Sequence, residues 1–225
     1  MRCDLPKWYD KKEMDKMEYE IRFYYSKGEK ENLLDKLNKI EKLKNMGTFY
    51  EKTTQYNSTL PENDFYSKEI DGRYRIRITK GDTESKCMLS WKRRLPDTKE
   101  GLINKEEEIE CRINPEDYEN FIYITEHILK MDRVESYERY RTNYANDLVE
   151  IAVDQYPFGI ALEIEAKADS NQNQIIDEYV KLLGLDYNDA YRLSWDDKYE
   201  ELCKEQNIEK VADVLFDCAN MPLVK

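Results

Sequence analysis

Seven short segments of the chain alternate charged and apolar residues, and this pattern constrains the fold more than any other feature. The segments cover residues 17–25, 73–79, 88–94, 106–113, 137–144, 148–154 and 161–167. Side chains two apart on a β-strand point to the same face, so each segment is expected to have one charged and one apolar face. The sequence therefore predicts a β-sheet in which one face is charged on strand after strand.

The charged residues of these segments are also sorted by sign. Basic residues dominate some segments (Arg73, Arg75, Arg77, Arg139 and Arg141), and acidic residues dominate others (Glu18, Glu20, Glu106, Glu108, Glu110, Glu163 and Glu165). A solvated sheet face usually mixes the signs, and arginines at two-residue spacing repel one another unless anions lie between them. If the sheet closes into a barrel, the charges meet inside it. Small barrels normally fill with apolar side chains, so a charged lumen implies a charged ligand.

The residue types in this predicted lumen fit a polyphosphate that carries a metal ion. Arginine forks match phosphate oxygens, and paired carboxylates suit a hard divalent cation such as Mg²⁺ or Mn²⁺. The chain has only one histidine, His127, and five cysteines without a C-x-x-C pair, so few residues are available for other kinds of catalysis or metal binding. Histidine-dependent nucleophilic catalysis and zinc sites are therefore disfavoured. The chemistry is left to carboxylates, Lys, Arg and Tyr.

Helical patterns occupy the rest of the chain. Residues 29–45 place apolar side chains one helical turn apart, which predicts an amphipathic helix that Gly47 ends. Asn114 and Pro115 predict the start of a helix that runs to about Met131. After residue 168 the segments 175–185, 196–206 and 209–219 are all typical of helices. We expect one domain over residues 1–168 and a helical extension, 169–225, that packs on it.

Charge and hydropathy limit the partners. The formal net charge is −12, which disfavours binding of duplex nucleic acid. No apolar run approaches the roughly 18 residues of a membrane span, and the amino-terminal segment lacks the apolar core of a secretory signal. We therefore expect a cytoplasmic protein without a membrane partner. The sequence leaves the oligomeric state open, a dimer included.

At these residues the chain resembles the CYTH superfamily, the triphosphate tunnel metalloenzymes. This group includes class IV adenylyl cyclases, thiamine triphosphatases, tripolyphosphatases and metal-dependent RNA triphosphatases. The matching motifs, in family order over about residues 17–168, are Glu18-Tyr-Glu20-Ile-Arg22, Arg75-Ile-Arg77, Lys92, Glu108-Ile-Glu110, Arg139-Tyr-Arg141, Asp154 with Pro157 and Gly159, and Glu163-Ile-Glu165. The resemblance implies an α+β fold: a closed antiparallel eight-stranded β-barrel, or tunnel, with helices packed outside and a helical carboxyl-terminal tail.

The resemblance also implies a role for each matching residue. The metal ligands would be Glu18, Glu20, Asp154, Glu163 and Glu165. The phosphate-binding residues would be Arg22, Arg75, Arg77, Lys92, Arg139 and Arg141. The catalytic set would be Glu20, Glu108, Glu110 and Arg139. The implied cofactor is Mg²⁺ or Mn²⁺, and the implied partner is a small molecule that carries a triphosphate, ATP among them.

Two departures from the family pattern bear on the activity. Arg22 replaces the lysine of the opening strand, as in viral RNA triphosphatases of the superfamily. Arg139 stands where some triphosphatases are thought to use a lysine to activate water. Arginine stays protonated and cannot be a general base, so Glu108, Glu110 or a metal-bound hydroxide would have to take the proton. A histidine near the amino terminus of typical class IV cyclases is also absent.

The leading hypothesis is accordingly a metal-dependent phosphohydrolase that acts on tripolyphosphate, a nucleoside triphosphate or a similar molecule. Three alternatives remain open. They are an adenylyl cyclase that makes cyclic AMP and diphosphate, an RNA 5′-triphosphatase, and a polyphosphate- or nucleotide-binding module without turnover.

Overall fold

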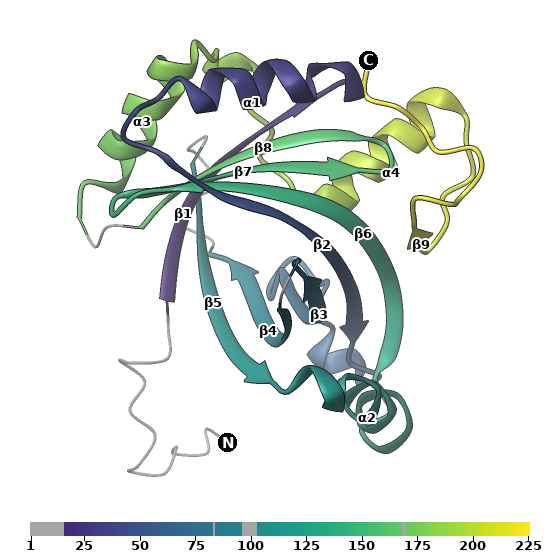
Figure 1. Ribbon diagram of the computed structural model, residues 1–225. Helices are drawn as coiled ribbons and strands as arrows, with labels where there is room; N and C mark the ends of the chain where they lie inside the picture. Colours follow the sequence, from purple (N-terminus) through teal and green to yellow (C-terminus); the bar gives the residue numbers. More distant parts are fainter. Residues whose placement is uncertain (1–15, 83, 96–102, 168–169) are drawn as a thin grey trace.

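The computed structural model describes residues 16–82, 84–95, 103–167 and 170–225, and its centre is a closed β-barrel (Figure 1). Within these ranges eight antiparallel strands form the barrel in the order β2-β3-β4-β5-β1-β8-β7-β6, and pairing of β6 with β2 closes it. The strands are β1 (Lys16–Tyr25), β2 (Lys44–Asn57), β3 (Gly72–Lys80), β4 (Ser85–Arg94), β5 (Asn104–Ile113), β6 (Asp132–Ala145), β7 (Val149–Tyr156) and β8 (Gly159–Ala166). The predicted α+β fold with a closed eight-stranded barrel is confirmed.

The helices lie outside the barrel. They are α1 (Lys30–Asn38), α2 (Tyr118–Tyr123), which continues as a π-helix (Ile124–Ile128), α3 (Gln172–Leu183) and α4 (Trp195–Gln206). Short 3-10 turns cover Lys27–Glu29, Pro61–Asn63, Pro115–Asp117 and Tyr187–Asp189. The predicted start at Asn114 is confirmed, because its side chain accepts a hydrogen bond from the backbone N–H of Glu116. No helix in the described ranges is long and apolar enough to cross a membrane.

Strand β2 is the one barrel strand that the sequence pattern did not reveal. The helix predicted over 29–45 ends at Asn38, and the chain then turns, with the backbone N–H of Leu43 donating to the carbonyl of Ile40. Ile40 and Leu43 still pack on the same apolar cluster as the helix, so their spacing fits either backbone path. Gly47 does not end a helix. Its φ of 103° lies in a β-bulge of β2, a backbone conformation that favours glycine.

The prediction of a third helix in the tail, over 209–219, is wrong. Residues Asp213–Val214 form a short strand, β9, which pairs in parallel with Ser136 and Tyr137 of β6. Val214 is fully buried in the cluster that contains Tyr137. The apolar spacing in this segment thus reflects packing on the barrel. Its backbone forms hydrogen bonds with β6 instead of the internal hydrogen bonds of a helix.

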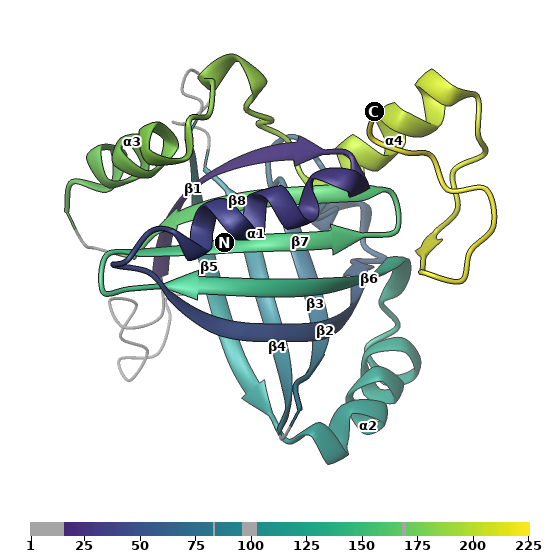
Figure 2. The ribbon, with the colours of Figure 1, turned by 45° about the horizontal axis from the view of Figure 1, so that its top comes forward.

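The apolar faces of the strands point outward and are covered by helices. Helices α1 and α3 cover β1, β7 and β8, and Figure 2 shows α1 lying across β7 and β8. Their cluster includes Ile21, Ile151, Leu162, Ile164 and Ile176, all 0% exposed. A second cluster, with Ile76 and Tyr56, lies under α2. Because the core lies outside the barrel, the charged faces turn inward. The tail packs on the barrel, and the predicted boundary at residues 168 and 169 falls outside the described residues.

Candidate active site

The inward faces of the strands enclose a cavity of about 380 Å³. Nearly all residues predicted for the site line it: Glu18, Glu20, Arg22, Arg75, Arg77, Lys92, Glu108, Glu110, Arg139, Arg141, Glu163 and Glu165. They come from β1, β3, β4, β5, β6 and β8, so closure of the barrel brings together side chains that are up to 147 positions apart in sequence. We call this cavity the tunnel.

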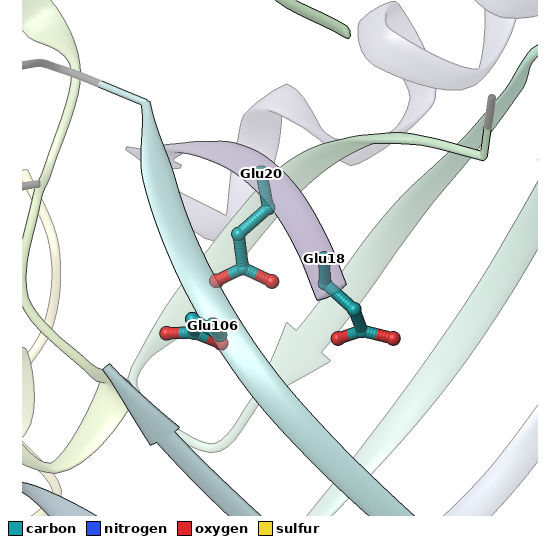
Figure 3. Close-up of side chains that lie close together, drawn as sticks. All are labelled: Glu18, Glu20 and Glu106. Atoms are coloured by element: carbon teal, nitrogen blue, oxygen red, sulfur yellow. The ribbon is translucent and has the colours of Figure 1, made fainter. Parts of the chain in front are cut away.

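A cluster of three buried carboxylates lies at one side of the tunnel, where Glu18 and Glu20 line the cavity and Glu106 adjoins them. Glu18 and Glu20 come from β1 and Glu106 from β5, and Figure 3 shows them side by side. One oxygen from each lies within 4.8 Å of the others, and the strand register places Glu106 opposite Glu18. Lys92 lies among them, with Nζ 2.9 Å from Glu18 Oε2, 3.2 Å from Glu20 Oε2 and 2.6 Å from Glu106 Oε2.

The donor set of this cluster fits a divalent cation. Carboxylate oxygens are hard ligands of the kind that Mg²⁺ and Mn²⁺ take. Lys92 and Arg22 both contact the cluster, with Arg22 Nη2 2.9 Å from Glu20 Oε1, so three carboxylates face two cations. Burial by itself lowers the pKa of Lys92, but Glu20 and Glu18 outweigh burial and raise that pKa above its usual value. Lys92 is therefore protonated and contributes one of these positive charges.

The predicted metal ligands of β8 adjoin this cluster. The register places Glu165 opposite Glu20 and Glu163 opposite Arg22. Arg22 joins the two strands, because its Nε donates to Glu163 at 2.8 Å and its Nη2 to Glu20 at 2.9 Å. Burial by itself raises the pKa of Glu163, but Arg22 and Arg141 outweigh burial and hold it well below the usual value. Glu163 is therefore an anion over the whole physiological pH range.

Asp154, predicted as a metal ligand, shares the inward face of β7 with Glu150 and Tyr156 but is 0% exposed. Its Oδ1 accepts from Arg141 Nε at 2.7 Å, and its Oδ2 accepts from Arg141 Nη2 at 2.6 Å and from Arg139 Nη1 at 2.7 Å. Both oxygens are thus used to orient two arginines. Metal binding by Asp154 stays a prediction.

Arg139 is the most deeply buried of the predicted phosphate-binding residues, at 3% exposure. Besides Asp154 it contacts Glu51 Oε2 at 2.7 Å and the hydroxyl of Tyr156 at 3.1 Å. Arg77 is held more loosely, with Nε 3.2 Å from Thr53 Oγ1 and 3.9 Å from Glu51 Oε2. These contacts hold the guanidinium groups at the tunnel wall but use only some of their five N–H donors.

The two predicted proton acceptors occupy different surroundings. Glu108 is 8% exposed and accepts from Arg75 Nη2 at 2.5 Å, whereas Glu110 is exposed, farther along β5. Burial raises the pKa of Glu108, against the opposing effects of Lys92 and Arg75 and with a further increase from Glu18. Glu108 therefore takes up a proton more readily than an ordinary glutamate does.

Several residues that line the tunnel or contact its lining were not predicted for the site. Glu51 lies on β2, the strand that the pattern did not reveal. Glu106 shares the strand face of Glu108 and Glu110, so the alternation indicated an inward side chain. The E-x-E motif matched only Glu108 and Glu110, and Glu106 was therefore given no role. Tyr137 and Trp195 also line the tunnel, with ring centroids 4.2 Å apart. Trp195 begins α4, and no period-two pattern links that helix to the lumen.

Because Glu51 and Arg139 form a buried ion pair, we expect part of the free energy of unfolding to depend on pH in the acid range. Burial raises the pKa of Glu51, but Arg139 and Arg77 outweigh burial and hold it far below the usual value. A depressed folded-state pKa stabilises the fold above the unfolded-state value of about 4.3, and this contribution is lost as the pH falls below it. The difference in free energy of unfolding between wild type and Glu51→Gln is therefore expected to shrink by roughly 1–2 kcal/mol from pH 7 to pH 3. Urea unfolding at both pH values measures it, and a pH-independent difference would contradict the assignment.

Comparison with known proteins finds the fold among solved structures. No protein-family model and no curated protein matches the chain. Among solved structures, the PH1012 protein of Pyrococcus horikoshii is similar with a TM-score of 0.63 and 18% identity, covering 80% of this chain and 98% of that one. A proposed adenylate cyclase of Vibrio parahaemolyticus gives 0.61 and 12%, covering 81% and 97%.

A plant protein has the same fold. It is a proposed adenylyl cyclase of Hippeastrum that is described as having a dominant triphosphatase activity, and it gives a TM-score of 0.54 and 16% identity, covering 86% of this chain and 97% of that one. At these identities the likeness concerns the fold. The chain thus has the fold of these solved structures, a closed barrel of the kind that the motifs on its strands led us to expect.

Proposed function

We propose that the protein is a metal-dependent phosphohydrolase that cleaves a triphosphate bound in the tunnel. The observation that carries this proposal is the charge balance of the lining, which holds seven carboxylates and seven basic side chains. A triphosphate alone would add several uncompensated negative charges to this buried space, which is costly. Entry together with divalent cations keeps the charge balanced, so the tunnel suits a metal-chelated triphosphate better than a bare anion.

The carboxylate wall would hold the metal. Glu18, Glu20 and Glu106 offer three oxygens close together, and Glu163 and Glu165 lie on the neighbouring strand. When bound, Mg²⁺ or Mn²⁺ would supply Lewis-acid stabilisation of charge on the phosphoryl oxygens. The ion also requires that these carboxylates stay ionised, and the depressed pKa of Glu163 agrees with that requirement.

The basic residues would bind and orient the phosphate chain. Arg75 and Arg77 project from β3, and Arg139 and Arg141 project from β6. Their guanidinium forks can each donate two hydrogen bonds to phosphoryl oxygens. Asp154 and Glu51 fix the directions of Arg139 and Arg141 before the substrate arrives. Phosphoryl transfer depends mostly on such positioning and on electrostatic stabilisation.

Hydrolysis forms one P–O bond from water and breaks one phosphoanhydride P–O bond, and the attacking water loses a proton. Arg139 cannot accept that proton because its pKa is raised: burial lowers the pKa, but Asp154 and Glu51 outweigh burial. Glu108 would accept that proton, because its own pKa is raised and it lines the tunnel. The products are then orthophosphate and the shortened chain.

The proposal predicts release of orthophosphate when purified protein is incubated with Mg²⁺ or Mn²⁺ and tripolyphosphate, ATP or triphosphorylated RNA. Chelation by EDTA is expected to stop the release, because the carboxylate wall then lacks its cation. A Glu20→Gln preparation, purified in the same way, controls for contaminating phosphatases. Absence of phosphate from every substrate with either metal would contradict the proposal.

The same assay separates the alternatives. Cyclic AMP plus diphosphate from ATP would identify an adenylyl cyclase, the reaction suggested for the Vibrio parahaemolyticus neighbour. Release of phosphate from RNA ends alone would identify an RNA 5′-triphosphatase. Tight binding without any product would identify a binding module. The choice of substrate is thus read from the products.

A further inference from the structure

A small basic cavity adjoins the tunnel at the end where α4 begins. Its volume is about 60 Å³, and it shares Arg22, Arg75, Lys92 and Trp195 with the lining of the tunnel. Six basic residues and three acidic residues line it, in contrast to the equal numbers in the tunnel. We call this cavity the antechamber. Its excess of positive charge stands out in a chain whose net charge is −12.

Arg73 is the central cation of the antechamber. Its Nη2 donates to Asp196 Oδ2 at 3.1 Å, and the guanidinium stacks on the ring of Tyr66, 4.2 Å from its centroid. Asp196 is 8% exposed and belongs to the first turn of α4. Within the described part of the chain, Arg73 Nε and Asp196 Oδ1 are buried and have no hydrogen-bond partner. The carboxylate of Asp196 therefore fits this basic site only in part.

Arg94 is a second cation with loose contacts. It lies 3.6 Å from Asp197, 3.7 Å from Asp71 and 3.9 Å from Glu106, all beyond hydrogen-bond distance. Its side chain is only 16% exposed, and among the described residues its guanidinium has no partner within hydrogen-bond distance. A tetrahedral oxyanion, with more oxygens than a carboxylate, can satisfy Arg73 and Arg94 at the same time.

We infer that the antechamber is a subsite for one further phosphoryl group, and that Asp196 stands in for that group in the free protein. The inference rests on the proposed function, because the group would continue the phosphate chain held in the tunnel. The antechamber has room for about four water-sized groups, which suits a phosphoryl group and is too small for a nucleoside. The substrate class is therefore an inorganic polyphosphate longer than three units, or a triphosphate accompanied by free orthophosphate.

The test compares binding of tripolyphosphate and tetrapolyphosphate by isothermal titration with Ca²⁺ in place of Mg²⁺ or Mn²⁺, after an assay for released phosphate has shown that no turnover occurs under these conditions. Tetrapolyphosphate is expected to bind about tenfold more tightly, as one additional charge-assisted hydrogen-bonded group allows. Arg73→Gln is expected to bring the ratio of the two dissociation constants close to one. Asp196→Asn is expected to raise the ratio, because it removes the charge that competes for Arg73. Opposite effects of these two variants would not arise from general loss of structure.

Arg112→Gln is the matched control. Arg112 is exposed on β5, so this substitution removes the same charge at a position away from the antechamber. It should keep the wild-type ratio. Equal binding of both polyphosphates by wild type, or no response to Arg73→Gln in a protein with an unchanged melting temperature, would overturn the inference. Failure of the proposed function would appear separately, as absence of phosphate release with Mg²⁺ or Mn²⁺.

Orthophosphate distinguishes the two sources of the group. If it lowers the affinity for tetrapolyphosphate but leaves that for tripolyphosphate unchanged, the antechamber also accepts the free ion. If it has no effect while the ratio still depends on Arg73, the antechamber accepts only a phosphoryl group within a chain. Both results support the subsite.

Discussion

Glu20→Gln is expected to lower kcat/KM for the hydrolysed triphosphate by about a thousandfold or more. The amide has the size of the carboxylate but no charge for a divalent cation, and a bound cation contributes several kcal/mol to transition-state stabilisation. Glu20 is 4% exposed and one of three carboxylates whose oxygens lie within 4.8 Å of one another. Loss of one carboxylate would leave two carboxylates beside Lys92 and Arg22, and therefore no net negative charge to attract the cation. Phosphate release over a range of Mg²⁺ concentrations measures the effect.

The control for this prediction is Glu119→Gln, which changes the same chemical group at an exposed position of α2. Its kcat/KM should equal that of wild type. Glu20→Gln should also unfold as a cooperative protein, so that a loss of activity is not a loss of fold. Activity of Glu20→Gln within a fewfold of wild type, without a higher Mg²⁺ requirement, would remove Glu20 from the metal site.

Arg139→Met is expected to lower the free energy of unfolding by about 3–5 kcal/mol, because it removes the closest cation from buried Glu51 and one of the two arginines that pair with buried Asp154. Arg139 contacts both Glu51 and Asp154 at 2.7 Å, and these carboxylates are 6% and 0% exposed. A loss of this size is a large share of the 5–15 kcal/mol typical of a folded domain. Urea unfolding at pH 7, followed by circular dichroism, measures the loss.

Two variants show whether the loss comes from the unpaired charges. Arg139→Met combined with Glu51→Gln should be more stable than Arg139→Met alone, because one uncompensated carboxylate is removed. Arg112→Met, at an exposed position of β5, should change stability by no more than about 0.5 kcal/mol. A loss below 1 kcal/mol in Arg139→Met would show that the lumen tolerates unpaired carboxylates, against the basis of the charge balance proposed above.

The part of the site that the sequence predicted shares one property: each residue lies on a strand with regular alternation. In Glu18-Tyr-Glu20-Ile-Arg22, parity alone places the three charged side chains on the face opposite Tyr19 and Ile21. The same holds for Arg75 with Arg77 and for Glu163 with Glu165, and all of these residues line the tunnel. The period of the strand is a local property of the backbone, so it can be read without knowing the neighbours.

The residues that the sequence missed are those whose position depends on pairing. Glu51 lies on β2, where Thr53, Thr54 and Gln55 are all buried and no apolar face stands out. Glu106 joins Glu18 and Glu20 only because β5 pairs with β1 in one register. Asp196 reaches Arg73 across 123 positions of sequence, through the packing of α4 against the end of the barrel.

The sequence by itself determined which face of each strand is charged and, through its resemblance to the tunnel proteins, that the strands close on those faces. Only the tertiary structure decided which charges pair, that Asp154 orients Arg139 and Arg141, and that α4 places a carboxylate in a basic cavity. The physical reason is range: the alternation of side chains is set within one strand, whereas partners 2.5–4 Å apart in the lumen are set by strand register and helix packing.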